Sequence, residues 1–192
     1  MFRLGLDIDG CINDFGSLLH RYASVFSEKY GIEKQSDMSD YSVETYFGWS
    51  EYINNEFWSK YYKVIMVMAL PQPGAVEAIS LLRRSGIEIY LITARMEKYR
   101  ELTTEWLDKY NVQFDSLIMT SEKAKACVKN QIDLMVEDEP ENCESIAEYK
   151  PVLCMSYKYN ERLEGRKNII RVANWVEIYN EVMRCARQGQ AV

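Results

Sequence analysis

The stretch LGLDIDGCIND, residues 4–14, places Asp7 and Asp9 directly after a short apolar run and directly before Gly10. The apolar run predicts a strand that is buried on both faces. Asp and Gly are also favoured in turns, so a simple surface turn is one interpretation of the pair. The other interpretation is that two carboxylates stand at the end of a buried strand, and the rest of the chain decides between them.

Apolar runs bounded by turn signals recur along the chain and predict further strands at IEIYLIT (87–93), DSLIMT (115–120), IDLMVED (132–138) and KPVLCMS (150–156). Helical patterns lie between or after these runs, at 74–86, 97–111, 122–131, 140–149 and 174–188. This alternation predicts an α/β fold, with a Rossmann-like parallel sheet and helices on both of its faces. Such sheets bind their ligands beyond the carboxyl ends of the strands.

Polar side chains follow four of the predicted strands at those carboxyl ends. They are Asp7 and Asp9, Thr93 and Arg95, Thr120 and Ser121, and Glu137, Asp138 and Glu139. The last group could simply begin a helix, because carboxylates stabilise helix N-termini. Buried carboxylates that are packed together repel one another, however, and a bound cation relieves that repulsion. Oxygen ligands without histidine or cysteine favour Mg²⁺, so the sequence predicts a magnesium site and phosphate chemistry.

Residues 15–70 interrupt the alternation of strands and helices. More than fifty residues are too many for a loop, and the segment contains helical patterns, so we expect a small helical insertion over the site. The predicted division is a core of residues 1–14 and 71–192 and a cap of residues 15–70. The cap is rich in aromatic residues, on which a nucleobase could stack or which could form the core of the cap. We expect Phe15 and Tyr41 to face the site.

Composition narrows the classes of partner. Lys and Arg number 23 and Asp and Glu number 29, a net charge of −6 that disfavours a nucleic-acid polymer or an anionic membrane as the partner. A small phosphorylated metabolite stays compatible with this charge. The five widely spaced cysteines predict reduced thiols. No charged leader or membrane-length apolar run occurs, so we expect a cytoplasmic protein; the oligomeric state, including a homodimer, is left open.

Four sequence features together resemble a known family. LDIDG (6–10), LITAR (91–95), a lysine-led helix and the acidic pair after the strand at 132–138 are similar, in this order, to the motifs of the haloacid dehalogenase superfamily of phosphatases. The helical insertion resembles the C1 type of cap in that superfamily. The segments at 71–95 and 133–147 resemble the small 5′(3′)-deoxyribonucleotidase branch, the type C 5′-nucleotidases, and its bacterial relatives.

The resemblance implies roles for the residues that match the motifs. Asp7 is implied as the nucleophile and a metal ligand, and Asp9 as the general acid and base with its backbone carbonyl on the metal. Asp138 is implied as the remaining metal carboxylate, and Thr93 as the hydroxyl that binds phosphate. Lys123 fits the position of the lysine best.

Four positions leave alternatives open. Lys125 would point about 200° around the helix from Lys123, so the two lysines cannot serve equally. Arg95 could contact the phosphate or pair with a helix carboxylate. Glu137 replaces the more usual aspartate, and Cys11 replaces the usual threonine or valine; we expect Cys11 to pack rather than react.

The predicted function is a Mg²⁺-dependent phosphomonoester hydrolase that acts through an aspartyl-phosphate on a nucleoside monophosphate or similar small metabolite. A sugar-phosphate phosphatase of the same superfamily is one alternative. A haloalkanoate dehalogenase is another, which Asp9 and the acidic pair disfavour. A non-catalytic binding or regulatory protein with the same fold is the alternative from another class, and the sequence does not identify a base, a sugar or a 5′ or 3′ position.

Overall fold

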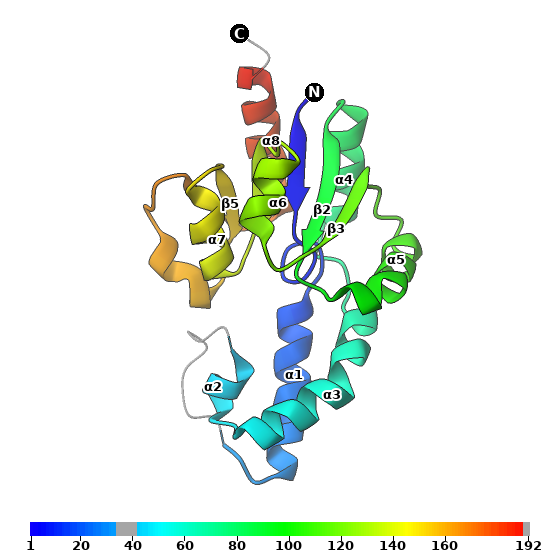
Figure 1. Ribbon diagram of the computed structural model, residues 1–192, viewed down its shortest axis with the longest axis vertical. Coiled ribbons are helices and arrows are strands. Elements are labelled where there is room, and N and C mark those ends of the chain that lie inside the picture. The colour runs from blue at the N-terminus through cyan, green and yellow to red at the C-terminus, as the bar shows by residue number, and fades with distance from the viewer. Residues whose placement is uncertain (34–41, 190–192) are drawn as a thin grey trace.

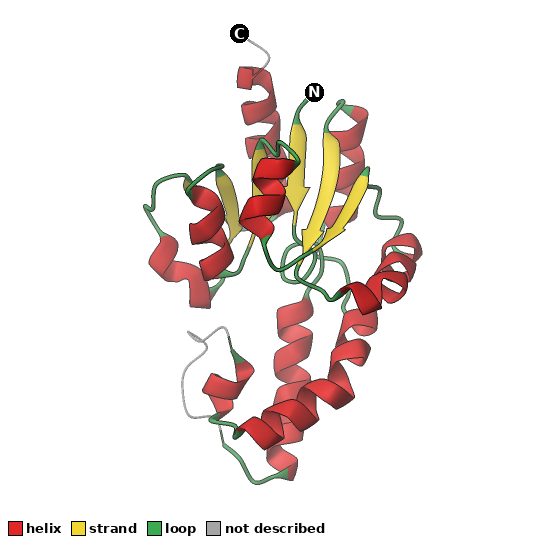
Figure 2. Ribbon diagram, viewed as in Figure 1, coloured by secondary structure: helices red, strands yellow, loops and turns green. Residues whose placement is uncertain are grey.

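The computed structural model describes residues 1–33 and 42–189, and in these ranges the fold is built on one parallel sheet (Figures 1 and 2). The strand order is β3-β2-β1-β4-β5-β6, and every neighbouring pair is parallel. The strands are β1 Arg3–Leu6, β2 Glu88–Thr93, β3 Ser116–Met119, β4 Leu134–Glu137, β5 Val152–Met155 and β6 Ile169–Val172. The α/β prediction is therefore confirmed.

The sequence prediction missed β6. This strand is only four residues long and lies at the edge of the sheet, where Ile170 is exposed and Arg171 is half-buried. The continuous apolar run that marks a strand covered on both faces is therefore absent at this position.

Helices cover both faces of the sheet, as the alternation predicts (Figure 1). Helices α4 (Ala75–Arg84), α5 (Arg100–Lys109) and α8 (Trp175–Gly189) share one core with alternate residues of the strands, such as Leu134 and Val136. Helices α6 (Lys123–Lys129) and α7 (Pro140–Ala147) share a second core with the intervening residues, such as Met135. Successive side chains of a strand point to opposite faces, so both faces of the sheet are buried. Two short 3₁₀ helices lie at Glu97–Tyr99 (η1) and Lys158–Leu163 (η2).

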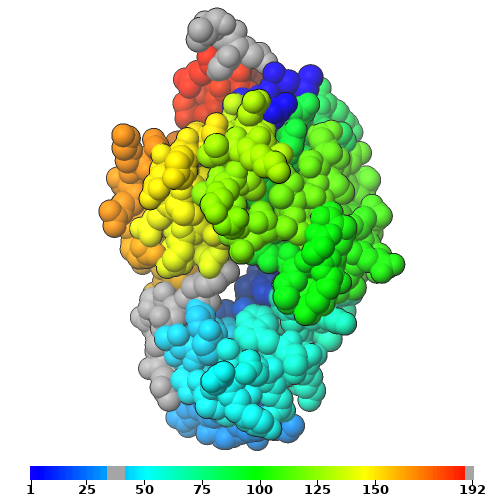
Figure 3. Space-filling view, in the orientation of Figure 1, coloured from blue at the N-terminus to red at the C-terminus, as the bar shows by residue number. Residues whose placement is uncertain are grey.

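Helices α1 (Phe15–Lys29), α2 (Val43–Phe47) and α3 (Glu51–Met68) lie beyond the carboxyl ends of the strands (Figure 1). They pack around an aromatic cluster of their own, which includes Phe26, Phe47, Trp49 and Phe57. The chain enters and leaves this group side by side, because the backbone N–H of Asp14 donates to the carbonyl of Leu70 at 2.9 Å. Figure 3 shows the surface hollowed between these helices and the sheet body. The division into core and cap at these residues stays a prediction.

All five cysteines are free thiols, and four of them are buried. In residues 1–33 and 42–189, no helix is both long and apolar enough to cross a membrane.

Candidate active site

The ends of three neighbouring strands supply the candidate functional side chains. Asp7 follows β1, Thr93 ends β2, and Asp138 follows β4, and β1 lies between β2 and β4 in the sheet. From β1 the chain first adds β2 and β3 on one side and then β4, β5 and β6 on the other, so the direction of strand order changes beside β1. Open α/β sheets bind ligands at this position. The residues Asp7, Thr93 and Asp138 are all at most 5% exposed.

A cavity of about 440 Å³ lies over these strand ends. The sheet side of its lining contains Asp7, Asp9, Thr93, Arg95, Lys123 and Asp138, to which the sequence analysis gave roles in catalysis or binding. The other side is formed by α1, α2 and α3, and it includes Phe15, Leu19, His20, Val43, Trp58 and Tyr62. Phe15 thus lines this cavity, while Tyr41 lies outside the described residues.

Lys123 bridges two carboxylates at the base of this cavity. Its Nζ lies 2.8 Å from Glu137 Oε2 and 2.9 Å from Asp7 Oδ1, and the lysine is only 3% exposed. Burial would lower the pKa of Lys123, but the charges of Asp7 and Glu137 raise it well above its usual value. Lys125, in contrast, is 77% exposed and pairs with Glu122 on the surface. The structure therefore brings Lys123 to the site and leaves Lys125 outside it.

The buried carboxylates exceed the charge that Lys123 supplies. Burial raises the pKa of Asp7 to about 7. The charge of Lys123 opposes this rise, and the charges of Glu137 and Asp9 add to it. Burial, followed by the charges of Glu137 and Asp7, raises the pKa of Asp138 well above its usual value. Asp7 Oδ1 is buried and accepts no hydrogen bond from residues 1–33 or 42–189, so its contact with Lys123 at 2.9 Å is an ion pair without hydrogen-bond geometry. This excess of negative charge favours a bound cation.

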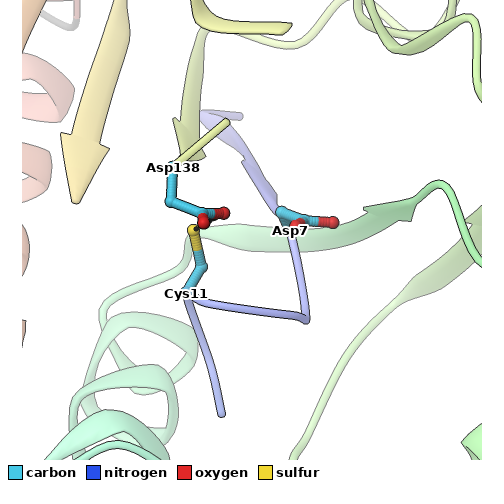
Figure 4. A group of neighbouring side chains, drawn as sticks. All are labelled: Asp7, Cys11 and Asp138. Carbon is cyan, nitrogen blue, oxygen red and sulfur yellow. Dashed lines mark hydrogen bonds between the residues drawn. The ribbon is translucent and has the colours of Figure 1, made fainter. Parts of the chain in front are cut away.

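Asp7, Cys11 and Asp138 bring one potential ligand atom each to within 4.8 Å of the others (Figure 4). The two carboxylates suit a hard cation such as Mg²⁺, whereas a thiol does not. Cys11 is fully buried, and burial together with the charge of Asp138 raises the pKa of its thiol well above the usual value. The Cys11 thiol donates a hydrogen bond to Asp138 Oδ1, with a distance of 3.6 Å from Sγ to that oxygen. Cys11 therefore packs as expected and also orients a carboxylate.

Gly10 is required by the close approach of the chain to Asp138. Its φ is +87°, and a Cβ at this position would lie 2.3 Å from Asp138 Oδ2. Only glycine combines this backbone conformation with the absence of a Cβ. Tyr157 adds a further restraint, because its hydroxyl donates to the Gly10 carbonyl at 2.7 Å.

Gly10→Ala is accordingly expected to destabilise the protein by roughly 1–3 kcal/mol and to weaken metal binding, because Asp138 has to move. Gly86→Ala is the matched control, since Gly86 also has a positive φ, of +82°, but no atom of the described part of the chain lies within 4 Å of its Cβ position. Thermal unfolding with and without Mg²⁺ measures both effects. Equal metal-induced stabilisation of the two variants would contradict this role of Gly10.

Asp9 and Arg95 form a forked ion pair beside Asp7. The Arg95 Nε and Nη2 donate to the two carboxylate oxygens of Asp9 at 2.8 and 2.6 Å. The partner of Arg95 is thus Asp9 in the β1 loop and not a helix carboxylate, which corrects that alternative. The phosphate contact of Arg95 stays a prediction.

The third strand does not contribute as expected. Thr120 and Ser121 are not among the residues that line the cavity, and the Thr120 hydroxyl instead accepts from the backbone N–H of Glu122 at 3.1 Å. The physical reason is topological, because β3 lies at the edge of the sheet and is separated from β1 by β2.

The sequence reasoning missed the segment after β5. Tyr157, Lys158 and Tyr159 line the cavity, and the Tyr159 hydroxyl donates to Asp138 Oδ2. The Asn160 side-chain amide donates to the Asp138 carbonyl at 2.8 Å. The same signal that identified the other segments, a polar stretch directly after an apolar run, was present here in SYKYN.

Comparisons with known proteins agree with this geometry. Residues 1–188 match the family described as 5′ nucleotidase, deoxy (pyrimidine), cytosolic type C protein. YqfW of Bacillus subtilis, named as a candidate nucleotidase, is 32% identical over 92% of this chain and 91% of its own length. A Clostridium acetobutylicum protein named as a nucleotidase is 28% identical over 97% of this chain and 96% of its own length.

A solved structure shares the fold. The haloacid dehalogenase-like hydrolase SP0104 of Streptococcus pneumoniae superposes with a TM-score of 0.68 and 16% sequence identity, over 94% of this chain and 98% of the other. At this identity, the likeness concerns the fold alone.

Proposed function

This chain belongs to the cytosolic type C family of 5′-nucleotidases, and on that premise we propose that it hydrolyses nucleoside monophosphates with Mg²⁺ through an aspartyl-phosphate. The coarser assignment, a phosphatase of the haloacid dehalogenase superfamily, follows from the family itself. One observation carries the finer proposal. The buried carboxylate of Asp7 borders the cavity, belongs to the cluster of potential metal ligands, and lies 2.9 Å from the Lys123 ammonium.

The proposed reaction has two steps. In the first, a carboxylate oxygen of Asp7 attacks phosphorus, the bond from phosphorus to the ester oxygen breaks, and Asp9 gives its proton to the leaving oxygen. In the second, water attacks the phosphorus of the aspartyl-phosphate while Asp9 takes up a proton from that water. The second step breaks the bond to Asp7 and restores its carboxylate, so the products are an alcohol and inorganic phosphate.

The residues present fit a magnesium ion. Asp7 and Asp138 would hold it through their carboxylates and Asp9 through its backbone carbonyl, and the unsatisfied Asp7 Oδ1 is consistent with such a ligand. When bound, the ion neutralises the charge of the phosphoryl oxygens and of the carboxylates around them. Lys123 offsets further negative charge, and the hydroxyl of Thr93, a residue only 1% exposed, would bind a phosphoryl oxygen.

The helical side of the cavity supports a nucleoside as the rest of the substrate. Phe15, Trp58 and Tyr62 line it, and Tyr62 packs edge-on against both Phe15 and Trp58, with ring centroids 6.3 and 5.7 Å away. Aromatic faces bind nucleobases by stacking with little dependence on the base. Helices α1–α3 thus act as a cap that supplies the base-binding wall. The buried, free thiols fit a reducing compartment, so we place the activity in the cytoplasm.

Phe15→Ala is expected to raise the KM for nucleoside monophosphates by roughly 10-fold, since one base–aromatic contact is worth about 1–3 kcal/mol. The KM for p-nitrophenyl phosphate should change much less, because its ring leaves the base position empty. Tyr52→Ala, at an aromatic residue of α3 that is 73% exposed, is the matched control and should leave both values unchanged. A parallel rise for both substrates in Phe15→Ala would contradict base stacking at this residue.

The experiment that tests the function is a phosphate-release assay with nucleoside monophosphates, sugar phosphates and p-nitrophenyl phosphate. We expect release that needs Mg²⁺, stops with EDTA and is fastest for a nucleoside monophosphate. Preference for a sugar phosphate would reject the nucleotide substrate but keep the chemistry. No release from any substrate by the folded protein would reject the enzymatic proposal in favour of a binding protein.

A further inference from the structure

The ion pair between Arg95 and Asp9 is buried on the arginine side and open on the aspartate side. The side chain of Arg95 is 1% exposed, whereas that of Asp9 is 22% exposed and borders the cavity. Thr103, which is fully buried, accepts from Arg95 Nη1 at 3.2 Å and fixes the far end of the guanidinium. A guanidinium enclosed in this way presents little surface to a ligand and instead holds the carboxylate in front of it.

The hydrogen bonds to Asp9 are unequal for its two oxygens. Oδ1 accepts from Arg95 Nη2 at 2.6 Å and from Asn13 Nδ2 at 3.0 Å, while Oδ2 accepts from Arg95 Nε at 2.8 Å. Each carboxylate oxygen has two lone pairs. Among the residues that the structure describes, both lone pairs of Oδ1 are therefore engaged, and Oδ2 keeps one lone pair to which a proton can bind.

We propose that Arg95 is the positioning residue for the acid–base aspartate, and that Arg95 and Asn13 together leave Oδ2 of Asp9 as the oxygen that transfers the proton. The proposal rests on the proposed function, in which Asp9 protonates the leaving oxygen. It changes the expected role of Arg95 from binding phosphate to orienting Asp9. Lysine cannot take this role, because a single ammonium does not reproduce the fork of the guanidinium.

The dependence on the leaving group separates this role from its alternatives. A poor leaving group needs the proton of a general acid, whereas p-nitrophenolate departs without one. The value of kcat/KM reports only the steps up to this departure, so the later hydrolysis of the aspartyl-phosphate does not affect it. Phenyl phosphate and p-nitrophenyl phosphate therefore form the test pair, with Mg²⁺ present.

In Arg95→Met and Arg95→Lys we expect kcat/KM to fall by roughly 10- to 100-fold for phenyl phosphate and by less than about 3-fold for p-nitrophenyl phosphate. Asp9→Asn should show the same pattern with a larger loss, and adding Arg95→Met to it should cause little further loss. Thr103→Val, which removes only the support of Arg95, should give a weaker form of the pattern. Arg184→Leu, which removes an arginine–glutamate pair on the surface of α8, is the control and should change neither value.

Equal losses for both phosphates in Arg95→Met, with a raised KM, would show that Arg95 binds the phosphoryl group and would overturn the inference. Equal losses that follow a reduced folded fraction, measured by thermal unfolding, would assign Arg95 a structural role and would also overturn the inference. Thr103→Val extends the test to a protein that keeps Arg95. A failure of the proposed function is distinct, since then the wild-type protein would hydrolyse neither phosphate or Asp7→Asn would retain the activity.

Discussion

Asp7→Asn is expected to abolish phosphate release and, at the same time, to stabilise the metal-free protein. The loss of activity should be roughly 10³-fold or more, because an amide cannot replace the carboxylate as the attacking nucleophile. The gain in stability follows from the charges around Asp7. Asp7, Glu137 and Asp138 are buried together, and Lys123 is the cation placed between two of them.

The sign of the stability change follows from the pKa of Asp7, which burial raises from 3.8 to about 7. A raised pKa in the folded state means that the neutral carboxyl group favours folding below about pH 4, and that this contribution is lost as the pH rises through about 7. At about pH 8 the charged carboxylate therefore opposes folding by on the order of 4 kcal/mol, because each pKa unit corresponds to about 1.4 kcal/mol, and asparagine removes this cost. The Tm in EDTA should rise by roughly 10 °C.

Thermal unfolding of wild type and Asp7→Asn in EDTA measures this effect, and the difference should shrink as the pH is lowered toward about 4. Asp108→Asn, at an exposed aspartate of α5, is the control and should leave the Tm unchanged. Mg²⁺ should stabilise the wild type more than Asp7→Asn, because ligand binding to the folded state adds to its stability. A lower Tm for Asp7→Asn in EDTA would contradict the electrostatic account of the cluster.

Lys123→Met is expected to have the opposite effect on stability and the same effect on activity. It leaves the carboxylates of Asp7 and Glu137 buried without their cation, which should destabilise the protein by roughly 3–5 kcal/mol. Phosphate release should be lost with it, because no ammonium offsets the charge at the phosphoryl group.

Two further variants make this prediction specific. Adding Glu137→Gln to Lys123→Met removes one unpaired charge, so chemical denaturation should show part of the stability recovered while activity stays lost. Lys125→Met, in the same helix but on the surface, should behave as wild type in both assays. Loss of activity in Lys125→Met but not in Lys123→Met would reverse our assignment of the lysine.

The strand ends were predictable because their signal is local. A continuous apolar run marks a strand buried on both faces, and the polar residue that follows it marks the ligand edge of the sheet. That rule located Asp7, Thr93 and Asp138, which three adjacent strands bring together. The rule wrongly included Thr120 in the site, because the order of strands in the sheet is not a local property. Tyr159, in the polar stretch that follows β5, obeys the same rule although the sequence prediction did not include it.

The partners of charged and aromatic side chains were less predictable. Arg95 and Asp9 are 86 positions apart in the chain, and their pairing depends on the crossover that places β2 beside β1. In helix α3 of the insertion, aromatic residues occur on several faces, so periodicity does not separate the rings of the insertion's core from those that line the cavity. Phe47 and Trp49 are buried in the core, whereas Trp58 lines the cavity.

The central claim is that Asp7 itself carries the phosphoryl group. The most direct measurement is mass spectrometry of peptides after the reaction with p-nitrophenyl phosphate and Mg²⁺ is quenched rapidly in acid. We predict one added phosphoryl group on the peptide that contains Asp7, absent when EDTA is present and absent in Asp7→Asn. Rapid release of phosphate by wild type with no such adduct, or with the adduct on another residue, would contradict the claim.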